Sequence, residues 1–217
     1  MSEKIDLKEL ERKAYRSFFE DGIWDIYLGL LLLAMGAGPG VLALDVSPAH
    51  AALVGLALSA VALVIFFAGK KRLTIPRLGR VRFGPARALR KKKTTFVLAC
   101  SALLGVALLV VGATRSLPSL DLARVPMVAI IFGANCIIVF GLGAYYLDFG
   151  RLYAYGLLYA AAFPLGVVLH EQGRMSASFL VAYGLMAAPM LLIGLVLLFR
   201  FLRQHPAPAE RTSNGAA

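Results

Sequence analysis

The chain has 217 residues, of which 59% are hydrophobic and 16% charged, against about 45–50% and about 25% in a typical soluble domain. This imbalance excludes an ordinary water-soluble globular protein, because the excess apolar surface would face water. The net charge of +11 comes from residues 70–93, which hold eleven Lys and Arg and no acidic residue. The remainder balances at 12 basic and 12 acidic residues, so a general nucleic-acid binder is disfavoured and no nucleic-acid partner is expected.

Six apolar runs are long enough to cross a bilayer, whose core takes about 20 apolar residues per helix. In lipid such runs form helices, because every backbone donor and acceptor must be satisfied within the segment. The sequence therefore predicts an all-α membrane protein with six transmembrane helices in three hairpins. The predicted spans are Gly22–Leu44, Ala49–Ala68, Thr95–Gly112, Pro126–Leu147, Leu152–Leu169 and Ser178–Phe201.

The spans divide the chain into five predicted parts. Residues 1–21 form a cytoplasmic amphipathic helix, residues 22–68 the first two transmembrane helices, and residues 69–94 a basic cytoplasmic loop. Residues 95–201 hold the other four transmembrane helices, and residues 202–217 form a cytoplasmic tail. That tail is small, polar and proline-containing, so we expect it to be disordered.

Residues 3–20 have the pattern of an interfacial helix. Leu7, Leu10, Ala14 and Phe18 recur at spacings of three and four and so share one face. Charged side chains fall on the other face, which favours a helix lying on the membrane surface before it turns into the first span. The alternative is a short soluble helix packed on the cytoplasmic loop.

The first span carries an acidic residue, Asp25, about one turn from its start. An ionised carboxylate at that depth is costly without a partner or water, which makes Asp25 a candidate functional residue. A structural ion pair with an Arg or Lys of the basic loop is the favoured interpretation. Trp24 and Tyr27 beside it suit the headgroup region.

The basic loop has a pattern that could fold. L-T-I, P-R-L-G and R-V-R-F, residues 73–83, predict two short strands about a turn, a β-hairpin lying on the bilayer. Clusters of basic residues beside a span attract anionic headgroups and acidic proteins alike. The candidate contact residues for membrane lipid or an acidic partner are Arg77, Arg80, Arg82, Arg87, Arg90, Lys91, Lys92 and Lys93.

Further along the chain, Asn135 lies near the centre of the fourth span, where it either bonds to another helix or contacts a substrate. In the turn before the fifth span, Gly150 is available for an unusual backbone angle, and Asp148 and Arg151 could pair. Cys100 and Cys136 fall inside spans as small packing residues, so no disulfide is expected.

Charge placement predicts the orientation. The basic loop, both termini and Arg151 lie on one side with twenty Lys and Arg, and the other side has only Arg115, Arg124 and Arg174. This positive-inside bias puts both termini in the cytoplasm, in the cytoplasmic (inner) membrane of a bacterium or archaeon. A cleaved signal peptide fits poorly, because the first apolar run begins about 22 residues in.

No motif for catalysis is visible: G-x-S-x-G, C-x-x-C and the P-loop are absent. Histidine spacing typical of a metal site is also absent, so neither a metal nor another cofactor is expected. The leading hypothesis is a non-enzymatic membrane module whose basic loop contacts anionic lipid or an acidic partner. Its further partners would be a second copy of the chain, as a homo-oligomer, or a partner membrane protein. The alternatives are a small-solute or ion transporter and a lipid-modifying membrane enzyme.

One resemblance covers the first third of the chain. The segment F-F-E-D-G-I-W-D-I-Y-L-G-L, followed after the second span by R-L-T-I-P-R-L-G-R-V-R-F, resembles a pairing found in uncharacterised prokaryotic six-helix membrane proteins. The resemblance implies the multi-pass class and no activity. It also suggests that Trp24, Asp25, Pro76 and Gly79 belong together, with the hairpin docked near the start of the first span.

Overall fold

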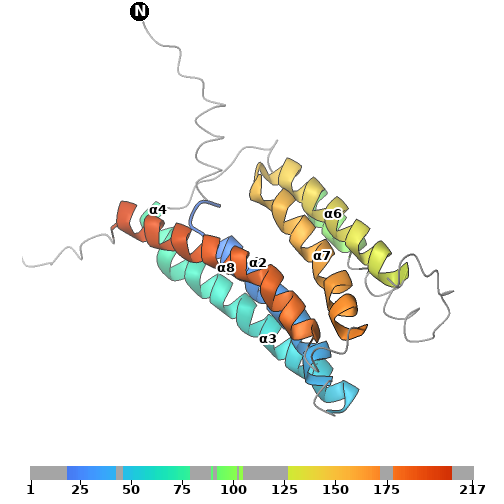
Figure 1. The fold of residues 1–217 in the computed structure, drawn as a ribbon. Helices are drawn as coiled ribbons and strands as arrows, with labels where there is room; N and C mark the ends of the chain where they lie inside the picture. The colour runs from blue at the N-terminus through green and yellow to red at the C-terminus, as the bar shows by residue number, and fades with distance from the viewer. Residues whose placement is uncertain are drawn as a thin grey trace, which may run out of the picture.

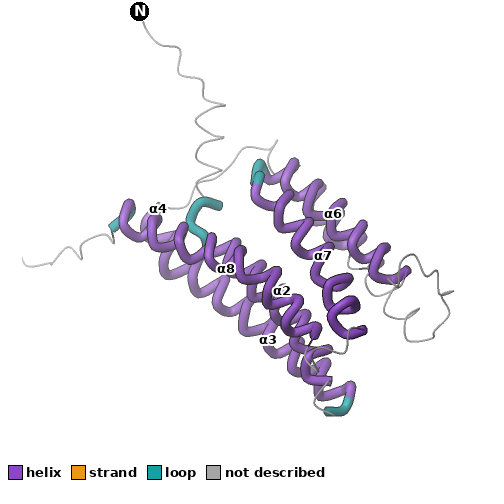
Figure 2. The backbone as a smooth tube through the Cα atoms, viewed as in Figure 1, coloured by secondary structure: helices purple, strands orange, loops and turns teal. Residues whose placement is uncertain are grey.

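The computed structural model describes residues 19–42, 46–78, 89, 92–101, 103–104, 127–171 and 178–206. All regular secondary structure in these ranges is helical (Figure 2), as the composition predicts. Five helices are long and apolar enough to cross a membrane: Ile23–Val41, Ala49–Arg77, Ala129–Leu147, Arg151–Glu171 and Ser178–Gln204. These helices support a multi-pass membrane protein.

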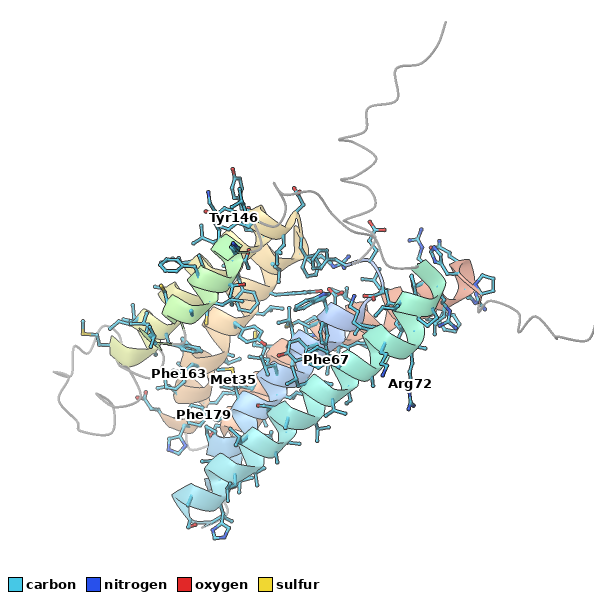
Figure 3. The ribbon with its side chains drawn as sticks, turned by 180° about the vertical axis from the view of Figure 1, so that it is seen from behind. Met35, Phe67, Arg72, Tyr146, Phe163 and Phe179 are labelled. Atoms are coloured by element: carbon cyan, nitrogen blue, oxygen red, sulfur yellow. The ribbon has the colours of Figure 1, made fainter. Side chains whose placement is uncertain are left out.

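The helices pack in an order that differs from their order in the chain. α2 (Ile23–Leu42) lies between α3 (Pro48–Gly69) and α8 (Ser178–Gln204), so the first and last described helices are neighbours (Figure 1). α7 (Arg151–Glu171) packs against α8 and also against α6 (Met127–Leu147). Side chains of α2, α6, α7 and α8 form the buried core. Among them, Phe163 and Phe179 meet between α7 and α8, with ring centroids 5.8 Å apart (Figure 3).

Gly22, just before α2, and three glycines on α2 allow the close approach of this segment to α8. A Cβ atom added at Gly22, Gly29, Gly36 or Gly40 would come within 2.2–2.9 Å of an atom of α8. The first three are spaced seven residues apart, which keeps them on one helical face. Small residues are the usual means of bringing membrane helices together, since dispersion contacts need close surfaces. Of these four, Gly22 also has a positive φ of 74°.

The second long helix runs ten residues past its predicted end at Ala68. It continues through a π-helix, η1 (Lys70–Thr74), and a short helix, α4 (Ile75–Leu78). The predicted first strand, residues 73–75, and the turn that begins at residue 76 are therefore wrong. Lys70 and Thr74 both bond Asp21, and a strand would hold them about 13 Å apart. The second predicted strand lies outside the described residues.

Residues 92–101 and 103–104 are also helical, and they include the described part of the third span predicted at Thr95–Gly112. It runs along α6: the Lys93 ammonium is 6.0 Å from the Tyr146 ring centroid, and Asn135 donates to Ser101 at 2.9 Å. The rest of that span, the predicted N-terminal helix up to residue 18, and the tail from residue 207 lie outside the described residues.

The turn between α6 and α7 uses a different residue from the predicted one. Asp148 has φ 52°, whereas Gly150 is not in the left-handed region. Aspartate tolerates this conformation better than most side chains. Phe149 N donates to the carbonyl of Ala144 at 3.1 Å, which closes α6 at this point. The turn thereby delivers Arg151 as the first residue of α7.

Candidate functional site

The lysines and arginines that the structure describes all lie at one end of the helices, which we call the basic end. Here α2 begins and α4, α6 and α8 end (Figure 1). Six of these side chains are exposed, and Arg72 points away from the bundle (Figure 3). The full set is Lys70, Lys71, Arg72, Arg77, Lys92, Lys93, Arg151, Arg200 and Arg203. The basic end therefore concentrates positive charge on the exposed side chains around two buried carboxylates.

The first buried carboxylate belongs to Asp21, just before α2. Lys70 Nζ lies 2.7 Å from its Oδ2, and Thr74 donates its hydroxyl hydrogen to the same oxygen. The backbone N–H of Ile23 donates to Oδ1 at 3.1 Å. A buried charge is tolerated when it is paired and hydrogen-bonded. Asp21 thus fixes the start of α2 to η1, so this segment does contact the start of the first span, though as helix.

The second buried carboxylate is Asp25, one turn further along α2. Arg151 holds it with two hydrogen bonds, from Nε to Oδ1 at 2.9 Å and from Nη2 to Oδ2 at 3.1 Å. Tyr155 donates its hydroxyl hydrogen to Oδ1. Arg151 Nη2 also donates to the carbonyl of Phe19 at 2.6 Å. Two-pronged Arg–carboxylate pairs are among the strongest polar contacts in proteins.

Together these contacts clamp the start of α2 between η1 and α7. Both carboxylate oxygens of Asp21 and of Asp25 have donors. One turn deeper, Tyr159 donates to the carbonyl of Leu28 at 2.7 Å. Asp25 is poorly placed to act as a general base, since three donors hold it and its charge is paired with Arg151. The arrangement therefore favours a structural role for Asp25.

The sequence identified Asp25 but not its partner. Arg151 comes from the tight turn before α7, whereas we had expected a residue of the basic loop, and Arg151 pairs with Asp25 instead of Asp148. Asp21, the partner of Lys70, was missed. Its position four residues before Asp25 was the available signal, because that spacing places both carboxylates near one face of a helix.

The described members of the predicted lipid-contact set behave differently from one another. Arg77 donates from Nε to the carbonyl of His205 at 2.9 Å and from Nη1 to that of Leu73 at 3.0 Å. Its guanidinium therefore ties α4 to the end of α8. Lys92 and Lys93 are exposed and available to ligands in solution or lipid. Arg80, Arg82, Arg87, Arg90 and Lys91 lie outside the described residues.

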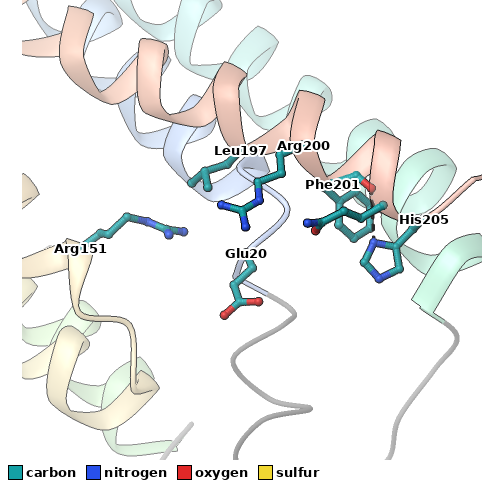
Figure 4. Close-up of a pocket in the computed structure, with 7 residues that line it drawn as sticks. Glu20, Arg151, Leu197, Arg200, Phe201 and His205 are labelled. Carbon is teal, nitrogen blue, oxygen red and sulfur yellow. Dashed lines mark hydrogen bonds between the residues drawn. The ribbon is translucent and has the colours of Figure 1, made fainter.

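A polar pocket of about 320 Å³ opens at the basic end beside Arg151. In Figure 4, Arg151 from α7 and Arg200 from α8 point toward the space beside Glu20. His205 closes one side, stacked on Phe201 with ring centroids 4.7 Å apart. The lining residues are Glu20, Arg151, Leu197, Arg200, Phe201, Gln204 and His205.

Phe19 and Trp24 line a second, apolar pocket of about 130 Å³. Trp24 packs edge-on against Phe66, with ring centroids 4.6 Å apart. Its indole Nε1 is buried and has no hydrogen-bond partner in the part of the chain that the structure describes. The remaining walls come from α2, α6, α7 and the helical residues 94–98.

Asn135 is half-buried on α6, and its side-chain amide donates a hydrogen bond to the Ser101 hydroxyl of the neighbouring helix. Cys136 is buried and Cys100 exposed. Over the described ranges, no group of three His, Cys, Asp or Glu side chains is arranged to hold a metal ion.

No protein-family model, no curated protein and no solved structure matches this chain.

Proposed function

We propose that this chain is a six-span protein of the cytoplasmic membrane that binds anionic lipid headgroups through its basic end. In this proposal it is a non-enzymatic membrane module with both termini in the cytoplasm. The observation that carries the proposal is the gathering of exposed cations at the end of the apolar helices. In the proposed membrane placement, this end faces the lipid headgroups. Each Lys or Arg near an anionic surface contributes about 1 kcal/mol of attraction.

The sixth span is supported by the ends of the described helices. α4 ends at the basic end, and α6 begins at the opposite one (Figure 1). The chain between them must therefore pass from one end to the other. Helical residues 92–101 start beside Tyr146 at the basic end and reach Asn135 in the middle of α6. The predicted end of this span at Gly112 lies outside the described residues, and the sixth crossing is part of the proposal.

Spin-labelled lipids in reconstituted vesicles test the lipid preference. Electron paramagnetic resonance gives the selectivity of the protein for phosphatidylglycerol over phosphatidylcholine. We expect the triple substitution of Lys91, Lys92 and Lys93 by Gln to bring this ratio toward one. The matched control replaces Arg115, Arg124 and Arg174, the cations predicted on the other side.

Equal selectivity in the lysine variant and the wild type would contradict the proposal. Capture of an acidic protein by wild type but not by that variant, with no lipid preference, would assign the basic end to a protein partner. Solute flux that depends on Asp25 or Asn135 would favour a transporter.

The orientation has a separate test. An epitope tag inserted after Gly79 should stay inaccessible to antibody in intact spheroplasts and become accessible after lysis. Labelling of the tag in intact spheroplasts would overturn the proposed threading.

A further inference from the structure

The polar pocket beside Arg151 is lined by charged side chains of both signs that are not paired with each other. Arg200 and Glu20 are exposed, and neither makes an ion pair within the described residues. They nevertheless line the same pocket, which Arg151 lines from α7 (Figure 4). The pocket therefore presents cations and an anion that do not neutralise one another by direct contact.

Arg151 enters this pocket already oriented. Asp25 takes its Nε and one hydrogen of Nη2, and the carbonyl of Phe19 takes the other. Nη1 makes no hydrogen bond to the described residues, and 31% of the side chain is exposed. One edge of a fixed guanidinium is thus left for a ligand, which lowers the entropy cost of binding.

Charge balance indicates the kind of ligand. The Arg151–Asp25 pair is neutral, and Arg200 with Glu20 adds one charge of each sign. A neutral zwitterion is therefore a better electrostatic match than a simple anion. Guanidinium groups are well suited to phosphate oxygens, and a carboxylate suits an ammonium group.

We propose that this pocket binds the headgroup of a zwitterionic phospholipid that carries a primary amine, of the phosphatidylethanolamine class. Arg200 and Arg151 Nη1 hold the phosphate, and Glu20 accepts hydrogen bonds from the ammonium. Leu197 and Phe201 supply an apolar wall for the glycerol end. The volume, about 320 Å³, falls in the usual range of small-ligand sites, roughly 300–1,000 Å³.

The lipid source follows from the position of the pocket. It opens at the end of α8, one of the helices long and apolar enough to cross a membrane. The site therefore lies at headgroup level, where lipid phosphates are concentrated. This step rests on the membrane placement in the proposed function, but not on its preference for anionic lipid.

Native mass spectrometry of protein released from mixed vesicles measures the bound headgroup. In vesicles of equal phosphatidylethanolamine and phosphatidylcholine content, wild type should retain mostly phosphatidylethanolamine. Arg200→Gln should lower the retained lipid about tenfold, the size expected for one charge-assisted contact. Glu20→Gln should remove the preference over phosphatidylcholine, whose trimethylated nitrogen donates no hydrogen bond.

Arg203→Gln is the matched control for Arg200→Gln. It is exposed on the same helix, and its guanidinium carbon lies 4.6 Å from the ring of Phe199, outside the pocket. It should leave retention unchanged. Equal retention of the two lipids by wild type, or equal loss in the two arginine variants, would overturn the assignment.

Soluble phosphoethanolamine, titrated onto detergent-purified protein, distinguishes a lipid from a free metabolite. Binding of the soluble compound as strong as that of the lipid, with the same dependence on Arg200, would overturn the lipid source. The test of the anionic-lipid proposal uses a different lipid, phosphatidylglycerol, and a different variant, at Lys91–Lys93. Each proposal can therefore be refuted while the other stands.

Discussion

Replacing Arg151 by methionine should destabilise the protein more than replacing Asp25 by asparagine, although both changes break the same ion pair. The reason is the different burial of the two partners: the Asp25 side chain is 0% exposed and that of Arg151 is 31% exposed. Arg151→Met leaves an ionised carboxylate inside the protein, with the Tyr155 hydroxyl as its remaining side-chain donor among the described residues. Asp25→Asn instead leaves a guanidinium that can turn toward the pocket and water.

The expected magnitudes follow from these two situations. Leaving a buried charge without its partner costs about 3–5 kcal/mol, and Arg151→Met also removes the bond to the carbonyl of Phe19. The asparagine of Asp25→Asn keeps one carbonyl oxygen, which can still accept from Arg151 Nε and Tyr155, so this variant loses mainly the bond from Arg151 Nη2 to Oδ2. One hydrogen bond to a charged group contributes about 1.5–3 kcal/mol. In the double variant no charge is stranded. The double variant should therefore be more stable than Arg151→Met alone. The effects of the two substitutions on the free energy of unfolding would then be far from additive, as expected for residues in contact.

Unfolding by sodium dodecyl sulfate in mixed micelles gives the free energies of unfolding. Trp24 is the single tryptophan of the chain, and its ring packs against Phe66 beside the clamp, so its fluorescence reports on this region. Two results would refute the reasoning. One is an Arg151→Met variant no less stable than Asp25→Asn, and the other is a double variant in which the two losses add.

Three further predictions concern the packing of the helices and use the same assay. Gly22→Ala should cost more than about 3 kcal/mol, because its Cβ would lie 2.2 Å from a carbonyl oxygen of α8 at a φ of 74°, whereas Gly150→Ala, with no atom within 4 Å, should be neutral. Equal effects would contradict the close α2–α8 contact. Tyr159→Phe removes a buried bond to a carbonyl of α2 and should cost about 1–3 kcal/mol; an unchanged midpoint would rule that bond out. Asn135→Ala should cost about 0.6–2 kcal/mol and nothing further when Ser101 is already alanine, so additive losses would show that the two side chains do not interact.

Local sequence is a good guide to the helices because lipid leaves the backbone few choices. The run predicted at Ser178–Phe201 is α8, Ser178–Gln204, and the run at Leu152–Leu169 is α7, Arg151–Glu171. Each backbone donor in such a run must find its acceptor within the segment, so composition alone indicates helix. The prediction of a strand at residues 73–75 was wrong because the apolar content falls there and polar and apolar residues alternate, as in a strand. The structure is helical at these residues.

The site depended on contacts that local pattern does not contain. Asp25 could be identified from the sequence because an ionised carboxylate inside a membrane span is costly without a partner. That argument holds wherever in the chain the partner lies. The identity of that partner required the tertiary structure, which brings the first turn of α7 to the start of α2, because Arg151 is 126 residues away along the chain. The same holds for the polar pocket, whose charged residues Glu20, Arg151 and Arg200 come from three separate segments.

The apolar, helical and charge-asymmetric character of this chain can be read from its residues alone, because those properties follow from composition and from the requirements of a backbone in lipid. Only the tertiary structure decided which charges neutralise one another and which remain for a ligand. A salt bridge such as that between Arg151 and Asp25 depends on geometry within about 4 Å, and that geometry exists only because the first turn of α7 reaches the start of α2 in the folded protein.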